Sequence, residues 1–306
     1  MNQITDELLR LISGIKSGEL KGAYNIREDG QCAARQSSEK ILIESKTDAP
    51  GLVIHIKPGT KGETVYIPAC VTKGDINDVT YNDFYIGEGA DITIVAGCGV
   101  HTDDGHDARH NGIHRFFIEK GAAVLYKEKH IGTGAGGGGK HIDPVTEIYL
   151  DEDSQLTMDT VQLSGVDSTT RTTSAVLKAR AKLLVRERLM TNGAEAARTD
   201  FDVKLEGEDS SADLVSRSVA RGRSHQQFRS NIRGLTRCTG HSECDAILAD
   251  SGTVLALPAL EASHIDASLI HEAAIGKIAS EQLMKLRTLG LTEAEAEERI
   301  IQGFLK

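Results

Sequence analysis

The chain has 306 residues, enough for one large domain or two of ordinary size. Its 45 Asp and Glu outnumber 35 Lys and Arg, and the resulting charge of −10 argues against a broad nucleic-acid interface. With no apolar run of about 20 residues, no secretion-type N-terminus and five scattered cysteines, we expect a cytoplasmic protein with reduced thiols, away from membranes.

The N-terminal part, residues 1–47, is predicted to be one helix followed by a connecting segment. Thr5 is placed as the helix cap, and apolar residues recur at helical spacing until the helix ends near Ser17. These apolar residues are Ile4, Leu8, Leu11, Ile12 and Ile15. From Ala23 to Lys46 the composition is mixed, with a turn signal at Asp29-Gly30 and a strand-like alternation at Ile41 and Ile43.

A degenerate repeat extends from about Pro50 to Pro258, and it predicts the fold. Each unit is a turn, a small residue and an alternating strand, with leading apolar residues at positions 65, 92, 124, 156, 183 and 214. These separations are too long for hairpins, and no amphipathic helix fills them. We therefore predict a mainly β fold, a right-handed parallel β-helix over residues 48–270 between helical ends, with a β-sandwich as the alternative.

The last segment, residues 271–306, is predicted to be helical. One helix is expected from Glu272 to Leu289 and a second from Thr292, where Thr292 and Glu295 form a capping box. Ile300, Ile301 and Phe304 give the second helix its apolar side. The pair is expected either to cap the open end of the solenoid or to dock a partner.

Two polar segments in the first half of the chain are tested against known motifs. Gly134 to Lys140 begins like a phosphate-binding loop, but His141 and Asp143-Pro144 follow where a Ser or Thr and a helix are needed, so a surface loop is favoured. A second group near Cys98 offers metal ligands without a closed zinc spacing, so a solvated loop is again favoured, with Cys98 as an accessible thiol. This group comprises His101, Asp103, Asp104, His106, Asp107, His110 and His114.

Cys238, His241, Glu243 and Cys244 form a denser group near the end of the repeat. In an extended strand the two sulfurs are about 20 Å apart, at about 3.3 Å per residue, so only a turn at Gly240 would let them bind one ion. Cys238 is expected to be a buried structural residue, whereas Cys244 is left open between burial and function. His271-Glu272 is placed where a strand-like stretch meets the first C-terminal helix.

Several of these residues resemble the SufB/SufD family, the scaffold proteins of the SUF iron–sulfur cluster assembly machinery. A weaker match covers Gly89 to Glu119, including Gly97-Cys98, and residues 22–27 resemble the start of the short SufB-like proteins of minimal SUF systems. The specific match comprises Glu243-Cys244-Asp245-Ala246-Ile247-Leu248, Pro258, Glu261, His271-Glu272-Ala273, Gly276-Lys277-Ile278, Gly290 and Gly303-Phe304.

The resemblance implies a parallel β-helix and a role as a scaffold that is not itself an enzyme. It implies sulfur entry as persulfide at Cys98, and assembly of a transient iron–sulfur cluster at Cys244 with His271 and Glu272. Glu243, the neighbour of Cys244 in sequence, is a possible further ligand. The resemblance further implies a SufC-type ABC ATPase bound through Ile300, Ile301 and Phe304, and a cysteine desulfurase or other sulfur donor.

The departures from the family refine this expectation. SufD-type members lack the assembly cysteine that Cys244 matches, and the chain is shorter than full-length scaffolds, so we expect a SufB-like protein that works as a homodimer. Flavin is associated with the larger complexes, and these residues neither support nor exclude it. The rival hypotheses are a β-helix carbohydrate-active enzyme, using acids such as Asp151, Glu152, Asp153 and Asp159, and a metal-free interaction scaffold.

Overall fold

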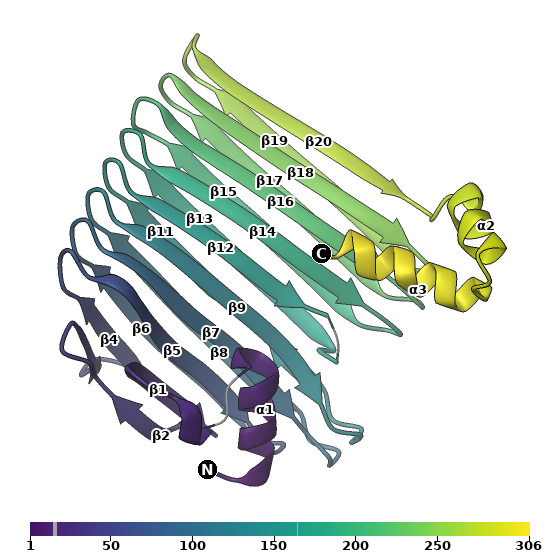
Figure 1. Ribbon diagram of the computed structural model, residues 1–306, viewed down its shortest axis with the longest axis horizontal. Coiled ribbons are helices and arrows are strands. Elements are labelled where there is room, and N and C mark those ends of the chain that lie inside the picture. Colours follow the sequence, from purple (N-terminus) through teal and green to yellow (C-terminus); the bar gives the residue numbers. More distant parts are fainter. Residues whose placement is uncertain (15–16, 164) are drawn as a thin grey trace.

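The computed structural model describes residues 1–14, 17–163 and 165–306, and it is a parallel β-solenoid of about eight turns with small helices at both ends (Figure 1). Over these residues the strands form two stacked sheets. The helices are α1 Gln3–Ser13, α2 Ser280–Thr288 and α3 Glu293–Phe304, with a 3-10 turn at Ser17–Glu19.

The first sheet contains every second long strand of the solenoid. In spatial order its strands are β2 Gln31–Gln36, β1 Ala23–Glu28, β5 Lys61–Val71, β7 Asp91–His101, β9 Ala123–Thr133, β12 Gln155–Gln162, β14 Lys182–Thr191, β16 Ser210–Ala220, β18 Cys238–Leu248 and β20 Ala267–Gly276.

The second sheet runs beside the first and closes the aliphatic core between them. In spatial order its strands are β19 Thr253–Ala262, β17 His225–Gly234, β15 Ala196–Leu205, β13 Ser168–Leu177, β10 Lys140–Ile142 with β11 Val145–Leu150, β8 Ala108–Ile118, β6 Asn77–Ile86, β4 Gly51–Ile56 and β3 Ile41–Ser45. The solenoid prediction is confirmed, and the β-sandwich alternative is wrong.

The strand pairing in the first sheet shows which of the predicted repeat positions are true neighbours in the stack. Ile92, Val124, Leu156 and Leu183 are direct neighbours along the stack, as the repeat predicts. Val65 pairs with Ile94, and Leu214 with Val185, so these two predicted positions are displaced by two residues. A one-residue register shift between Lys61 and Glu63 pairs Val65 with Ile94 rather than with Val95, which keeps Val65 on the inner face. A displacement of two keeps the side chain on the same face, which is why the pattern still read as one repeat.

The N-terminal predictions need two corrections. Asn2, rather than Thr5, caps α1, because its side chain accepts from the Thr5 backbone N–H, and the helix ends earlier, at left-handed Gly14. Ile15 lies outside the described residues. The predicted connecting segment is instead a β1–β2 hairpin that turns at Asp29-Gly30, both with positive φ, and β1 pairs in parallel with β5.

The C-terminal predictions also change. The helix expected from Glu272 begins only at Ser280, because β20 pairs with β18 as far as Gly276 and this pairing overrides the local preference of its alanines for helix. The capping box at Thr292 is confirmed. The helices do not cap the solenoid as one prediction had it: α3 packs Ile301 against Val219 on the side of the stack.

The end of the stack therefore keeps apolar surface. Leu255 on β19 and Ile270 on β20 are 44% and 52% exposed.

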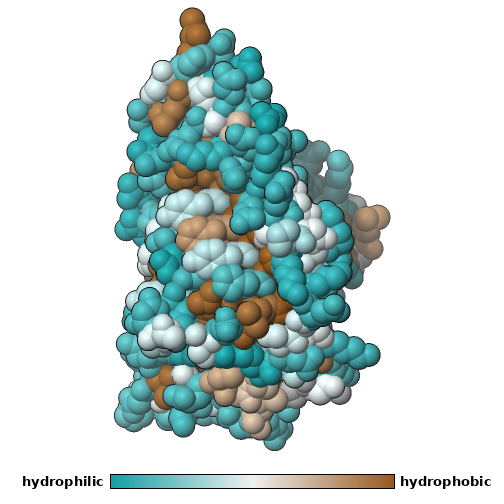
Figure 2. Space-filling view, turned by 90° about the vertical axis from the view of Figure 1, so that its left-hand side faces the viewer, coloured by the Kyte–Doolittle hydropathy of each residue, from teal (hydrophilic) through white to brown (hydrophobic). Residues whose placement is uncertain are grey.

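The face of the molecule in Figure 2 is mainly hydrophilic, with apolar side chains gathered in its middle. Among the described residues there is no helix that is both long enough and apolar enough to span a membrane.

Candidate functional site

Cys98 points into the solenoid from the middle of β7. Its neighbours Gly97 and Gly99 face α1 on the other side of the strand, where an added Cβ would lie 2.5 Å from the Ile12 Cγ2 and 2.8 Å from the Leu8 Cδ2. Gly97 also has φ of +150°. The two glycines thus let α1 lie directly on the strand that carries Cys98. The thiol is 5% exposed, which corrects the prediction that it is accessible at a strand end.

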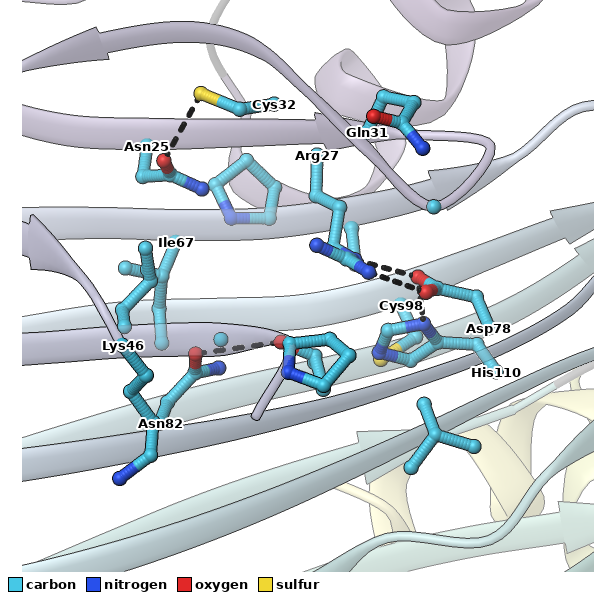
Figure 3. Close-up of a pocket in the computed structure, with 18 of the residues that line it drawn as sticks. Asn25, Arg27, Gln31, Cys32, Lys46, Ile67, Asp78, Asn82, Cys98 and His110 are labelled. Carbon is cyan, nitrogen blue, oxygen red and sulfur yellow. Dashed lines mark hydrogen bonds and ion pairs between the residues drawn. The ribbon is translucent and has the colours of Figure 1, made fainter. Parts of the chain in front are cut away.

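A cavity of about 630 Å³ adjoins Cys98 beneath the β1–β2 hairpin (Figure 3). On its wall the Arg27 guanidinium donates to both carboxylate oxygens of Asp78 at 2.7 and 2.6 Å, and the His110 Nδ1 lies 3.0 Å from Asp78. Burial alone would raise the pKa of Asp78, but its hydrogen bonds with His110 and Arg27 hold that pKa well below its usual range. Cys98 therefore lines a polar cavity beside a fixed ion pair, although burial raises the pKa of its thiol.

The predicted polar loop is confirmed only for residues 102–107. Asp103 and Asp107 accept backbone N–H groups of Ala135 and Gly139, so the acids hold the glycine-rich segment 134–139 against this loop. That segment is followed by β10 rather than a helix, which confirms that it is not a phosphate-binding loop. The loop prediction is wrong for His110 and His114, which are buried on β8.

A ladder of buried polar side chains links the levels of Cys98 and Cys244. Along the inner face of the first sheet the register gives one continuous line of neighbours, one residue per strand. We call this line the polar ladder; it consists of Glu128, Thr160, Glu187, Ser216 and Cys244. Cys98 lies in the adjacent line and is the direct neighbour of His130.

Side chains of the second sheet form ion pairs and hydrogen bonds with the two glutamates of the polar ladder. Arg171 donates to Glu128 at 2.5 Å, and its Nε lies 3.6 Å from Glu187. Burial would raise the pKa of Glu128, but Arg171 and then His130 hold it well below its usual range. Glu187 in turn accepts hydrogen bonds from the hydroxyls of Thr199 at 2.9 Å and Ser216 at 2.6 Å.

A small cavity lies beside the middle of the polar ladder. The Thr160 hydroxyl is buried without a partner beside a cavity of about 10 Å³ that Arg171 and Glu187 also line. A cavity of this size holds about one water molecule. This polar interior could not be predicted, because its polar residues occur once per turn at positions that alternation alone marks as core.

Cys244 is enclosed at the far end of the ladder. It is 1% exposed, and burial raises the pKa of its thiol to about 12, with Glu187 and Asp245 acting in the same direction. Cys238, on the same extended strand, is 4% exposed, as predicted for a structural cysteine. Gly240 makes no turn within β18, so Cys238 and Cys244 stay about 20 Å apart and do not share an ion.

The other residues predicted to assist Cys244 divide between the two faces of the sheet. His271 is the neighbour of Ser242 on the inner face, and its Nδ1 is buried without a hydrogen-bond partner. Glu243 and Glu272 are direct neighbours on the outer face, where His241 Nε2 lies 3.3 Å from Glu272. His271 thus shares the face of Cys244, whereas Glu243 and Glu272 do not.

The predicted docking residues lie on α3. Ile301 is 2% exposed against Val219, and Phe304 packs on the same cluster, so these two side chains are occupied within the chain. Ile300 is half-buried. By contrast, α2 buries no residue: Met284 within it is 65% exposed, and Leu289 at its C-terminal end is 79% exposed.

Comparison with known proteins places this architecture in a family. Residues 77–304 match the family described as SUF system FeS cluster assembly, SufBD core domain. An iron–sulfur cluster assembly SufBD family protein of Methanothermobacter thermautotrophicus (strain Delta H) is 31% identical over 277 residues, 89% of this chain and 66% of the relative. The chain therefore spans about two thirds of that protein.

Two further relatives carry the same family description. The Archaeoglobus fulgidus protein is 28% identical over 274 residues, 89% of this chain and 72% of its own length. The Methanocaldococcus jannaschii protein is 24% identical over 318 residues, 99% of this chain and 98% of its own length, so it is of similar size. The chain belongs to the SufBD family of iron–sulfur cluster assembly proteins.

Proposed function

We propose that this protein is the scaffold on which a transient iron–sulfur cluster is built, with sulfur entering at Cys98 and combining with iron at Cys244. One observation carries the proposal: Cys244 terminates a buried ladder of polar side chains that begins at Glu128, one register line from Cys98. Buried polar groups are costly unless they are hydrogen-bonded or used, and this line runs along the stack between the levels of the two thiols.

The chemistry at Cys244 requires a thiolate, because the thiolate is the form that binds iron. At neutral pH its raised pKa keeps the group protonated, so iron binding must release that proton. His271 lies on the same face, on the strand next to that of Cys244, and its Nδ1 is buried without a hydrogen-bond partner. This nitrogen can accept the thiol proton or bind iron as a weaker ligand. Weak ligation by imidazole suits a cluster that is later handed on.

The partners belong to the same proposal. A second copy of the chain docked at the apolar end of the stack, on β19 and β20, would enclose the inner face that carries Cys244 and His271. A SufC-type ABC ATPase would bind the C-terminal helices. With Ile301 and Phe304 packed on the chain itself, Met284 and Leu289 supply exposed apolar contacts for that partner.

Three of the four acids named for the carbohydrate-enzyme hypothesis form ion pairs. Asp153 pairs with Arg180 at 2.6 Å, Glu152 with Lys120 at 3.1 Å, and Asp159 with Arg188. Glycoside cleavage needs one carboxyl kept protonated and one free, and surface ion pairs favour neither.

The proposal is tested by anaerobic reconstitution with ferrous iron and sulfide, followed by visible absorption and metal analysis. Cys244→Ala should lose the sulfur-to-iron absorption band while keeping the circular dichroism spectrum. Cys238→Ala, the matched change on the same strand, should reconstitute like the wild type. Equal iron and sulfide content in the two variants would refute the proposal.

Partner binding is tested by co-purification with the ATPase. Met284→Asp with Leu289→Asp should abolish the complex without disturbing the core, because neither residue is buried. Ile301→Asp should also lose it, but by releasing α3 from Val219. A complex that survives both changes would refute docking through these helices.

A further inference from the structure

The outer face of β16, β18 and β20, opposite to the face of Cys244, carries a group of possible metal ligands. One ligand atom from each of His241, Glu243 and Glu272 lies within 4.8 Å of the other two. His241 and Glu243 come from β18 and Glu272 from the neighbouring strand, so the sheet pairing itself fixes their separation. Cys244 points to the opposite face.

His241 is oriented as metal-binding histidines are. Its Nδ1 lies 2.8 Å from a carboxylate oxygen of Asp213, its direct neighbour on β16, and this contact turns Nε2 toward Glu272. A carboxylate that holds one ring nitrogen fixes the ring and its tautomer while the other nitrogen binds a metal.

The two carboxylates supply the charge for a cation. Glu243 and Glu272 are directly opposite each other across the strand pair, an arrangement in which like charges destabilise a sheet. A divalent ion bound between them would remove this repulsion. Two of the three arginines that line the adjoining groove of about 640 Å³ are held by other acids: Arg186 by Asp213, and Arg188 by Asp159. The third, Arg217, acts electrostatically on Glu243.

We propose that His241, Glu243 and Glu272 form a surface site for one first-row divalent cation, positioned by Asp213. One imidazole and two carboxylates form a donor set that suits ferrous, cobaltous, manganous or zinc ions. That this site gathers iron on the outer side of the strand that carries Cys244 rests on the proposed function; the binding of the cation does not.

The test is an anaerobic cobaltous titration of the full chain, followed by visible absorption and calorimetry. The wild type should bind one ion per chain at this site, and His241→Ala and Glu272→Gln should each weaken it at least tenfold. Asp213→Asn should weaken it about 10–100-fold with the stoichiometry kept, and Asp213→Glu should restore part of the affinity. His225→Ala and Glu261→Gln, matched exposed changes, should bind like the wild type.

Cys244→Ala separates this inference from the proposed function. It should bind cobalt at the outer site unchanged even though it fails to build a cluster. Wild-type affinity in His241→Ala would overturn the surface site and leave the scaffold proposal standing. Loss of the bound cobalt in Cys244→Ala would also overturn it, because the ion would then be on the inner face.

Discussion

Cys98 and Cys244 both point into the solenoid from one sheet, on strands separated by β9, β12, β14 and β16. Five strand steps at about 4.8 Å place them roughly 24 Å apart. They cannot bind the same ion, so any shared chemistry is a relay along the interior. The polar ladder lies along that axis.

The enclosure of these thiols predicts a large difference in alkylation rate. Cys32 is exposed, whereas burial raises the pKa of Cys244 to about 12. Because alkylation requires an accessible thiolate, Cys32 should react with iodoacetamide at pH 8 on the order of a thousandfold faster than Cys244. Peptide mass spectrometry over a time course measures both rates. In denaturant the rates should converge, and comparable rates in the folded protein would contradict the burial of Cys244.

The buried ion pair at the start of the ladder predicts strong coupling. Arg171→Met leaves the Glu128 carboxylate buried without its guanidinium, which should cost about 3–5 kcal/mol of unfolding free energy. Adding Glu128→Gln should recover part of that loss. Arg180→Met, which removes an exposed pair with Asp153, should leave the unfolding free energy nearly unchanged. Urea unfolding of Arg171→Met, Glu128→Gln, their combination and Arg180→Met checks this, and additive effects of the Arg171 and Glu128 changes would contradict direct coupling.

The fold was predictable because alternation and a repeat of about 30 residues both survive small errors. Misaligning Leu214 by two residues left it on the inner face, so the solenoid still followed. Boundaries were less predictable. Ala273 and Ala274 favour helix locally, and only pairing with β18 holds them in a strand.

The site was predictable in its residues but not in their grouping. His271 and Glu272 are adjacent in sequence, yet a strand directs them to opposite faces, and predicting a helix start there hid this separation. The polar ladder was missed for a related reason. Thr160 and Glu187 become neighbours only through a register that no single turn of the sequence contains.

The packing of α1 on β7 predicts a glycine requirement at position 97. An added Cβ there would lie 2.5 Å from the Cγ2 of Ile12 on α1 and 2.2 Å from the backbone oxygen of Lys129 on β9, and φ is +150°, so Gly97→Ala should cost roughly 2–5 kcal/mol. Gly121→Ala is the control: φ is +65° with open space around the Cβ, and about 1 kcal/mol is expected. Thermal unfolding compares them, and an equal loss would show that the close approach of α1 and β9 is not what requires glycine.

The interior of the solenoid predicts that mild acid weakens the fold. His114 is 6% exposed, and burial lowers its pKa from 6.5 to about 4; its Nδ1 donates to the Tyr126 hydroxyl, which donates to Glu128. The folded pKa lies below the unfolded one, so the unfolded chain takes up the proton first. The stability from this group is therefore complete above pH 6.5 and lost as the pH falls from there toward 4.

Between pH 7 and pH 5 this linkage amounts to about 2 kcal/mol, and burial of His130 lowers its pKa and adds to the loss. His114→Gln keeps a donor for Tyr126 but has no proton to gain, so its unfolding free energy should fall by about 2 kcal/mol less than that of the wild type over this range. His225→Gln, an exposed change, should keep the wild-type slope. Urea titrations at pH 7, 6 and 5 measure the three slopes, and a wild-type slope in His114→Gln would show that the buried imidazole is not the group that acid attacks.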